Sequence, residues 1–290
     1  MNIENQIKPR RQTNWDWRAA GNFICGGSGS GLLLFAAIGV GPDLGYRPLA
    51  LVALMLIALG LFCVWLEIGR PLRSMNVLLH VQTSWMTREA LMAPPLFLSG
   101  AVAAWTGAVV WIWLSALLAV LFLYCQARIL QAAKGIPAWR AQRTVPLLIV
   151  TGLTEGVGLL ALASTLTNAA PKVWVPATLV ALLVLRAMLW RAYCKELAEQ
   201  KAPSKALAAL NAVAMPLSGI GYWVVAALAL LAALPGFGVL AGAAGLLAAA
   251  GGWLLKYTMI VRASFNQGYA LPRLPVRGGA APSTRAGAPS

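Results

Sequence analysis

Long apolar runs separated by short polar segments extend along most of the chain, from about residue 21 to residue 260. A helix needs about 20 mostly apolar residues to cross a membrane, and eight of the runs approach that length. The sequence therefore predicts an all-α integral membrane protein with eight transmembrane helices. The predicted spans lie near residues 21–40, 47–66, 90–104, 106–126, 145–166, 173–194, 207–233 and 236–260.

The same pattern divides the chain into three parts. Residues 1–20 form a cytoplasmic N-terminal segment, 21–260 an eight-helix membrane domain, and 261–290 a cytoplasmic, flexible tail. The first span contains a glycine-rich run at 26–31, and small residues allow helices to approach closely within a membrane. A weaker echo of that run at 156–158 favours an arrangement of two four-helix bundles.

Positive charge alternates between the connections. Of the 23 Lys and Arg residues, 20 fall in the N-terminus, every second loop and the C-terminus, whereas the opposite side carries Arg47 and Lys172. Basic loop residues stay on the cytoplasmic face. We therefore expect a multi-pass protein of the inner (cytoplasmic) membrane with both termini in the cytoplasm. The net charge of +15 then meets anionic membrane lipid, and nucleic acid is not an expected partner.

The residues that usually hold redox groups are scarce. The chain has one histidine, His80, which falls in a predicted loop, so a haem with two axial histidines is not expected. The four cysteines show no CxxC spacing, and no cluster with the spacing of metal ligands appears. The sequence therefore predicts no metal site in this chain.

Polar residues inside the spans are the candidates for function, because burying them in a membrane is costly. Glu155 and Arg186 lie about 15 Å and about 12 Å from the cytoplasmic ends of their spans, at about 1.5 Å per residue. A carboxylate and a guanidinium at similar depth should pair. Two interpretations remain open: a structural ion pair, or part of a proton pathway.

Another group of polar residues lies near the cytoplasmic ends of three spans: Asn22, Cys25, Glu67 and Tyr124. An amide, a carboxylate and a phenol are suited to holding a quinol and accepting its protons. If the first, second and fourth spans are neighbours, these residues line one pocket. The alternative is that each is a polar helix end that meets lipid headgroups.

The second cytoplasmic loop, residues 67–89, is too apolar for a solvated connection, and Gly69 and Pro71 interrupt it. Its apolar side chains need a surface, which is either the membrane interface or a docked protein. The candidate docking residues are Arg70, Arg73, Trp85 and Arg88.

Three stretches carry a family resemblance: 15–27 at the first span, 67–73 together with 84–89 in the second loop, and 256–268 at the last span. The most specific is Ser-Trp-Met-Thr-Arg-Glu at 84–89, and Gly-Arg-Pro follows within two residues of Glu67. With the eight-span plan, these motifs resemble the NrfD/DmsC group of membrane anchors of iron–sulfur molybdoenzymes. The residues of these motifs are most similar to those of the anchor of phenylacetyl-CoA:acceptor oxidoreductase.

The resemblance implies two four-helix bundles without haem and a site for a quinone, menaquinone or ubiquinone. It also implies two partners, a ferredoxin-like iron–sulfur subunit and a large molybdopterin catalytic subunit, which alone carry the clusters and the molybdopterin. Asn22 matches an asparagine of the family's quinone pocket, and Tyr124 matches a tyrosine there. Cys25 and Glu67 stand where relatives have histidine.

The function expected from these observations is that of a membrane anchor and quinone-reactive subunit. It passes electrons between a cytoplasm-facing oxidoreductase and the quinone pool, as in anaerobic respiration. One alternative is a secondary transporter with a midplane site at Glu155 and Arg186. The other is an anchor with a purely structural role.

Overall fold

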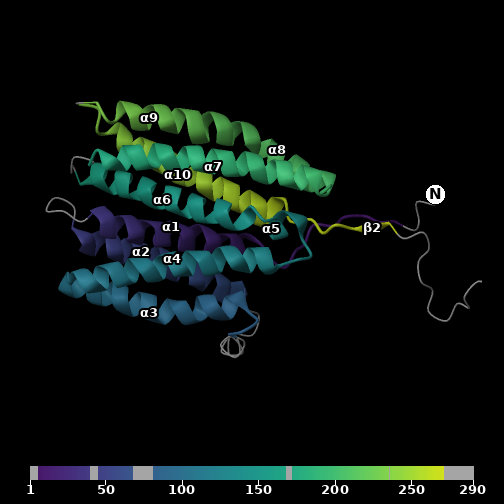
Figure 1. Ribbon diagram of the computed structural model, residues 1–290, viewed down its shortest axis with the longest axis horizontal. Helices are drawn as coiled ribbons and strands as arrows, with labels where there is room; N and C mark the ends of the chain where they lie inside the picture. Colours follow the sequence, from purple (N-terminus) through teal and green to yellow (C-terminus); the bar gives the residue numbers. More distant parts are fainter. Residues whose placement is uncertain (1–5, 40–44, 68–80, 168–171, 235, 271–290) are drawn as a thin grey trace, which may run out of the picture.

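The computed structural model describes residues 6–39, 45–67, 81–167, 172–234 and 236–270. Long helices account for most of them and lie side by side along one direction (Figure 1). The elements are β1 (Gln6–Ile7), α1 (Trp17–Gly39), α2 (Tyr46–Glu67), α3 (Trp85–Thr106), α4 (Val109–Ala132), α5 (Pro137–Arg140), α6 (Thr144–Leu166), α7 (Trp174–Glu199), α8 (Ser204–Ser218), η3 (Gly219–Val224), α9 (Val225–Leu231), α10 (Leu240–Tyr257), η4 (Thr258–Arg262) and β2 (Tyr269–Ala270).

Seven helical segments in the described residues are long and apolar enough to cross a membrane. They are α1, α2, α4, α6, α7, the continuous helix Ser204–Leu231 and the helix Val239–Arg262. This confirms an all-α, multi-pass membrane protein. The eighth predicted span corresponds to α3, which has 22 residues but includes Arg88, Glu89 and two prolines. The count of eight spans and the location of the termini therefore stay predictions.

A tight turn joins α3 and α4. Helix α3 ends at Thr106, and Gly107 follows with a positive φ, a left-handed conformation that glycine adopts without strain. At the other end of α3, the backbone N–H of Thr87 donates to Oγ of Ser84, which caps the helix. Ser84 thus starts the helix well before the predicted boundary at residue 90.

Glycines set the spacing between the central helices, as predicted for the run in the first span. A Cβ on Gly31 would collide with backbone atoms of Gly152 and Gly156 in α6, and Gly29 faces the carbonyl of Ala53 in α2. Helices α6 and α10 approach equally closely at Gly158. Helix α1 is therefore clamped between α2 and α6, with its backbone close to both.

The helices form two groups that meet at α1 and α6. Helix α1 packs against α2 and α4, and α3 packs against α2 and α4; α6 packs against α7 and α10, and α9 packs against α7 and α10. The division into two four-helix bundles as functional units stays a prediction. We call the end at which α1 begins and α2 ends the basic end; the pair β1–β2 extends from this end (Figure 1).

Candidate functional site

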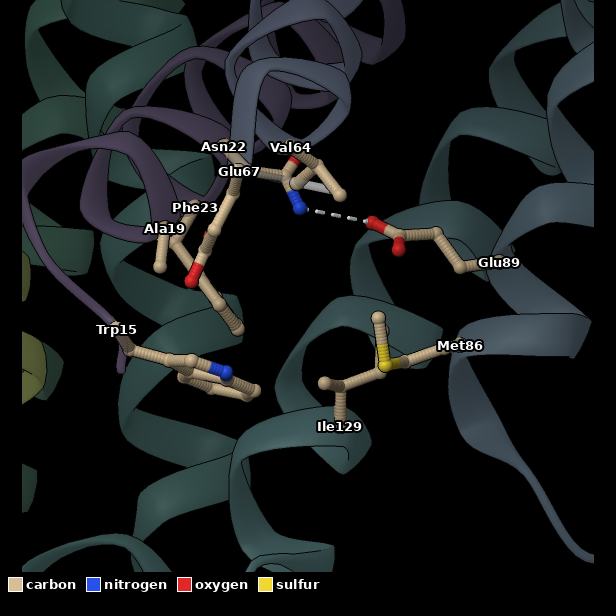
Figure 2. Close-up of a pocket in the computed structure, with 9 residues that line it drawn as sticks. All are labelled: Trp15, Ala19, Asn22, Phe23, Val64, Glu67, Met86, Glu89 and Ile129. Atoms are coloured by element: carbon tan, nitrogen blue, oxygen red, sulfur yellow. Dashed lines mark hydrogen bonds between the residues drawn. The ribbon is translucent and has the colours of Figure 1, made fainter. Parts of the chain in front are cut away.

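A cavity of about 220 Å³ opens between α1, α2, α3 and α4 at the basic end. Figure 2 shows its wall, with aromatic and aliphatic side chains around three polar ones. The lining residues are Trp15, Ala19, Asn22, Phe23, Val64, Glu67, Met86, Glu89 and Ile129. A mainly apolar cleft with a few convergent polar groups is the usual form of a small-molecule site.

Asn22 and Glu89 form the buried polar part of this cavity, and the amide of Gln126 bonds to Asn22. Nδ2 of Asn22 lies 3.3 Å from Oε1 of Glu89, to which it donates. Nε2 of Gln126 in α4 donates to both the side-chain oxygen and the backbone carbonyl of Asn22, at 3.2 Å and 3.1 Å. All three residues are buried. The arrangement fixes the amide of Asn22 between two helices, so that it can present a defined group to a ligand.

A glycine on α1 makes room for this cluster. A Cβ on Gly26 would collide with the amide of Gln126, so only glycine lets Gln126 reach the backbone of α1 at Asn22. Gly60 of α2 lies close to Asn22 as well, since a Cβ there would come within 3.2 Å of its Oδ1. The sequence signal for close helix packing therefore also creates the space for the polar site.

Glu67, the last residue of α2, lines the cavity near its outer end and is half-buried. Figure 2 shows it on the α1–α2 side, whereas Glu89 lies on the α3 side. Close to it, Nη1 of Arg18 donates to the carbonyl of Leu66, and Arg18 also forms a salt bridge with Asp16. The cavity thus has one deep carboxyl group and a second one near water.

Trp15 holds the outer wall in place. Its indole stacks on Trp139 of α5 with 4.9 Å between ring centroids, and Gln12 both accepts from its backbone N–H and donates to its carbonyl. Nε1 of Trp139 in turn donates to the carbonyl of Met259. The segment before α1 is therefore fixed to the second helix group.

The structure brings two of the four predicted quinone residues together. Asn22 and Glu67 line the same cavity, but Cys25 and Tyr124 are not among its lining residues. The ring of Tyr124 instead meets Trp85 edge-on, with 5.6 Å between centroids, and 38% of the residue is exposed. Cys25 is partly buried on α1.

Sequence reasoning missed the role of Glu89 and Gln126. The apolar pattern places Glu89 in a loop motif, one residue before the predicted start of the third span, and Gln126 at the last residue of the fourth predicted span. The cap at Ser84 is the signal that places Glu89 inside a helix, because it moves the start of α3 to Trp85. An acid within a membrane helix is then a site candidate.

Of the predicted docking residues, Arg70 and Arg73 lie outside the described residues. The guanidinium of Arg88 lies 4.1 Å from the ring centroid of Trp85, and that of Arg128 lies 4.8 Å from it. Arg88 also donates to the carbonyls of Val81 and Gln82. It therefore holds the segment that leads into α3, and a role of Arg88 or Trp85 in docking stays a prediction.

A second buried polar cluster lies on the other side of α1. Oε2 of Glu155 accepts from Nζ of Lys256 at 2.7 Å and from Oγ of Ser28 at 2.7 Å. Lys256 also donates to the carbonyl of Phe23, and Nε1 of Trp253 donates to Oγ of Ser28. The side chains of Glu155 and Lys256 are 0% and 1% exposed, so the salt bridge is sealed from solvent.

The predicted ion pair between Glu155 and Arg186 is not formed, because Lys256 takes that place. Arg186 is fully buried, but it donates to the carbonyls of Ala248 and Gly221 and lies over the ring of Tyr222. The π-helical segment η3 lets a backbone carbonyl turn to Arg186. Lys256, which the charge pattern places among the cytoplasmic basic residues, is instead buried in α10.

One comparison with known proteins finds a relationship. A family model of the NrfD type, described as polysulfide reductase, matches residues 8–270. The match spans every helix of the described residues and both helix groups. No curated protein matches the chain.

Proposed function

This chain belongs to the NrfD-type polysulfide reductase family, and from that premise we propose that it is the quinone-reactive membrane subunit of an oxidoreductase complex. Membership in this family supports a membrane subunit of a reductase complex. The cavity at the basic end supports a quinone-reactive role for that subunit. It combines an apolar wall for a ring with an amide donor and two carboxyl groups, Glu67 and Glu89.

The polar groups that line the cavity suit the oxidation of a quinol, and this is the observation that carries the proposal. Oxidation of a quinol to a quinone releases two electrons and two protons, so the site needs proton acceptors as well as a grip on the oxygens. The amide of Asn22 can donate to a quinone oxygen, since Gln126 fixes its orientation. Glu89 can accept a proton at depth, and Glu67 can pass one toward water.

The partners follow from the family and from the position of the cavity. We infer a ferredoxin-like iron–sulfur subunit docked at the basic end, where the cavity opens, and a large molybdopterin subunit behind it. Iron–sulfur clusters and molybdopterin belong to those partners, and the quinone, menaquinone or ubiquinone, is the substrate of this chain. The alternating charge supports a cytoplasmic position of the partners and residence in the inner membrane. We further propose a substrate in the cytoplasm, as the motif resemblance to the phenylacetyl-CoA:acceptor oxidoreductase anchor implies.

Neither alternative is favoured. For a transporter, Glu155 and Arg186 would have to offer a midplane site, but Lys256 and Ser28 occupy Oε2 of Glu155, and backbone carbonyls hold Arg186. For a purely structural anchor, no cavity beside the amide–carboxyl cluster at Asn22 would be needed.

Quinone-dependent electron transfer in the purified complex tests the proposal. With Asn22→Ala we expect the KM for quinol to rise about tenfold, which corresponds to the loss of about 1.4 kcal/mol of binding. With Glu89→Gln we expect kcat to fall at an unchanged KM, because the acceptor is lost while a hydrogen-bonding group remains.

Tyr124→Phe is the matched control, because Tyr124 lies near the same end but outside the cavity. It should leave both constants unchanged. Wild-type kinetics in both Asn22→Ala and Glu89→Gln would remove the cavity from the proposal. A wild-type complex that exchanges electrons with no quinone would overturn the proposed function itself.

A further inference from the structure

A groove of about 550 Å³ lies on the outer surface of the second helix group, between α7 and the continuous helix formed by α8, η3 and α9. Its walls are apolar, with Ala187 on one side and Ala226 on the other. Its rim includes Met215 and Trp223, which are 83% and 71% exposed. In a membrane these two side chains face lipid.

A distortion of the helix opposite α7 accompanies the groove. Pro216 lies inside α8 and supplies no backbone N–H, and the π-helical segment η3 follows it at Gly219–Val224. Such features bend or widen a helix. Arg186 of α7 holds the carbonyl of Gly221, so the altered turn is anchored from beneath. The space beside it is therefore built into the fold.

The groove has a defined depth in the membrane. Helix α7 begins at Trp174, and at the usual rise of an α-helix the stretch from there to Trp190 is nearly long enough to cross the hydrocarbon core. Arg191 therefore lies near the level of the lipid headgroups. From Arg191 the groove runs to Leu183, which lies about two helical turns further into the membrane.

Arg191 is the one charged residue among the lining residues of the groove, and it is exposed. Within the described part of the chain, no salt bridge engages it. Among the other polar groups nearby, Oγ of Ser218 donates to the carbonyl of Met215 and Arg186 binds two carbonyls, whereas the buried hydroxyl of Tyr222 has no hydrogen-bond partner among the described residues. The groove thus offers an apolar channel wide enough for a hydrocarbon chain. At its outer end lies the guanidinium of Arg191, which no described acidic residue neutralises.

We propose that this groove is a binding site for an anionic phospholipid, with one acyl chain along α7 and the phosphate group on Arg191. The one charge that lines the groove sits at headgroup level, where it suits an anionic phosphate better than the neutral oxygens of a quinone ring. Exposed Lys201 and Lys205 follow α7 on the same side and favour a headgroup with net negative charge. The inference does not depend on the proposed quinone chemistry, because it rests on the opposite helix group.

Native mass spectrometry of the purified protein in detergent, with its partner subunits if they copurify, tests the site. The probes are phosphatidylglycerol and phosphatidylethanolamine with identical acyl chains. We expect wild type to retain phosphatidylglycerol at least about tenfold better. Arg191→Gln should abolish that preference, and Lys134→Gln, which removes an exposed charge after α4 in the other helix group, should preserve it.

Filling the channel gives a second, independent readout. Ala187→Phe and Ala226→Phe, from opposite walls, should each reduce retention of both lipids, with thermal unfolding measured in parallel to show that the variants fold. Equal retention of the two lipids by wild type, or an unchanged preference in Arg191→Gln, overturns the proposal. A quinone, rather than a phospholipid, displaced by Ala187→Phe overturns it as well.

Discussion

Two buried polar clusters flank the same turn of α1, and they are built in opposite ways. On one side, Gln126 donates to the carbonyl of Asn22, and the cluster continues to Glu89 and the cavity. On the other side, Lys256 donates to the carbonyl of Phe23 and neutralises Glu155. The first cluster relies on neutral amides and reaches an opening, whereas the second pairs full charges in a sealed interior.

The difference separates function from stability. A sealed ion pair offers little access to a substrate, and its loss leaves a charge without compensation in a medium of low polarity. An amide cluster beside a cavity tolerates the loss of one group better, because water or a ligand can replace it. We therefore expect variants of the first cluster to change catalysis and variants of the second to change folding.

The largest effect should come from Lys256→Met. It leaves the carboxylate of Glu155 buried without its cation, and breaking such a pair costs about 3–5 kcal/mol. The free energy of unfolding in detergent should fall by that amount, as measured by chemical denaturation. The double variant Lys256→Met with Glu155→Leu should recover most of it, whereas Lys205→Met at an exposed position should have no effect. A double variant as unstable as the single one contradicts this account.

Two adjacent glycines give the next largest effect and separate the clusters directly. A Cβ on Gly27 would collide with Nζ of Lys256, and one on Gly26 would collide with the amide of Gln126. Gly27→Ala should cost about 1–3 kcal/mol, because the ammonium loses a hydrogen bond in a buried site. Gly26→Ala should change stability by less, since the amide is neutral and alanine favours the helix by up to about 1 kcal/mol.

The quinone kinetics of the same two variants provide the matched comparison. Gly26→Ala should raise the KM for quinol, because Gln126 no longer orients Asn22, and Gly27→Ala should leave it near the wild-type value. Equal kinetic effects in both variants would show that the clusters act as one unit across α1.

A smaller effect is expected from Glu67→Gln. Glu67 is half-buried at the outer end of the cavity, where water can take over proton transfer. We expect kcat to fall by a few-fold, less than in Glu89→Gln, and stability to stay unchanged. Measuring kcat of both variants over a range of pH shows which of the two substitutions lowers it more. A larger loss in Glu67→Gln would make Glu67 the principal proton acceptor.

The sequence predicted the fold well, because membrane helices carry a strong, continuous signal. The apolar runs correspond to the long helices, and the glycine run at 26–31 corresponds to the tight packing of α1. The boundaries of α3 were less accurate, because Arg88 and Glu89 lower the apolar content of its first turn. From the hydrophobic pattern alone, this first helical turn is predicted to be part of a loop.

The candidate site was only half predictable. Asn22 and Glu67 are polar residues near helix ends, so their positions pointed to one cavity. The partner of Glu155 could not be chosen from depth alone, since Arg186 and Lys256 both reach the interior, and packing of α10 against α6 decides between them. Lys256 was also counted among the cytoplasmic basic residues, because the amino-acid composition does not distinguish a buried lysine from an exposed one.

The smallest effect concerns the partly exposed pair of Asp16 and Arg18, which repeats the pairing of Glu155 and Lys256 within reach of water. Oδ1 of Asp16 accepts from Nε of Arg18 at 3.0 Å, and the side chains of Arg18 and Asp16 are 30% and 38% exposed. The hydrogen bonds from Arg18 lower the pKa of Asp16 below its usual value of 3.8. The pair therefore stabilises the fold above that value, and this contribution disappears as the pH falls through the lowered pKa.

We expect Arg18→Gln to lower the Tm slightly at pH 7 and by less once Asp16 is protonated, when only the hydrogen bond to the carbonyl of Leu66 is lost, in contrast to Lys256→Met. Thermal unfolding of both variants and of wild type at pH 7 and in a series that falls to about pH 2 measures the difference. High salt should screen the exposed pair and leave the buried one unaffected. A salt-insensitive loss in Arg18→Gln as large as that in Lys256→Met would show that burial does not distinguish the two pairs.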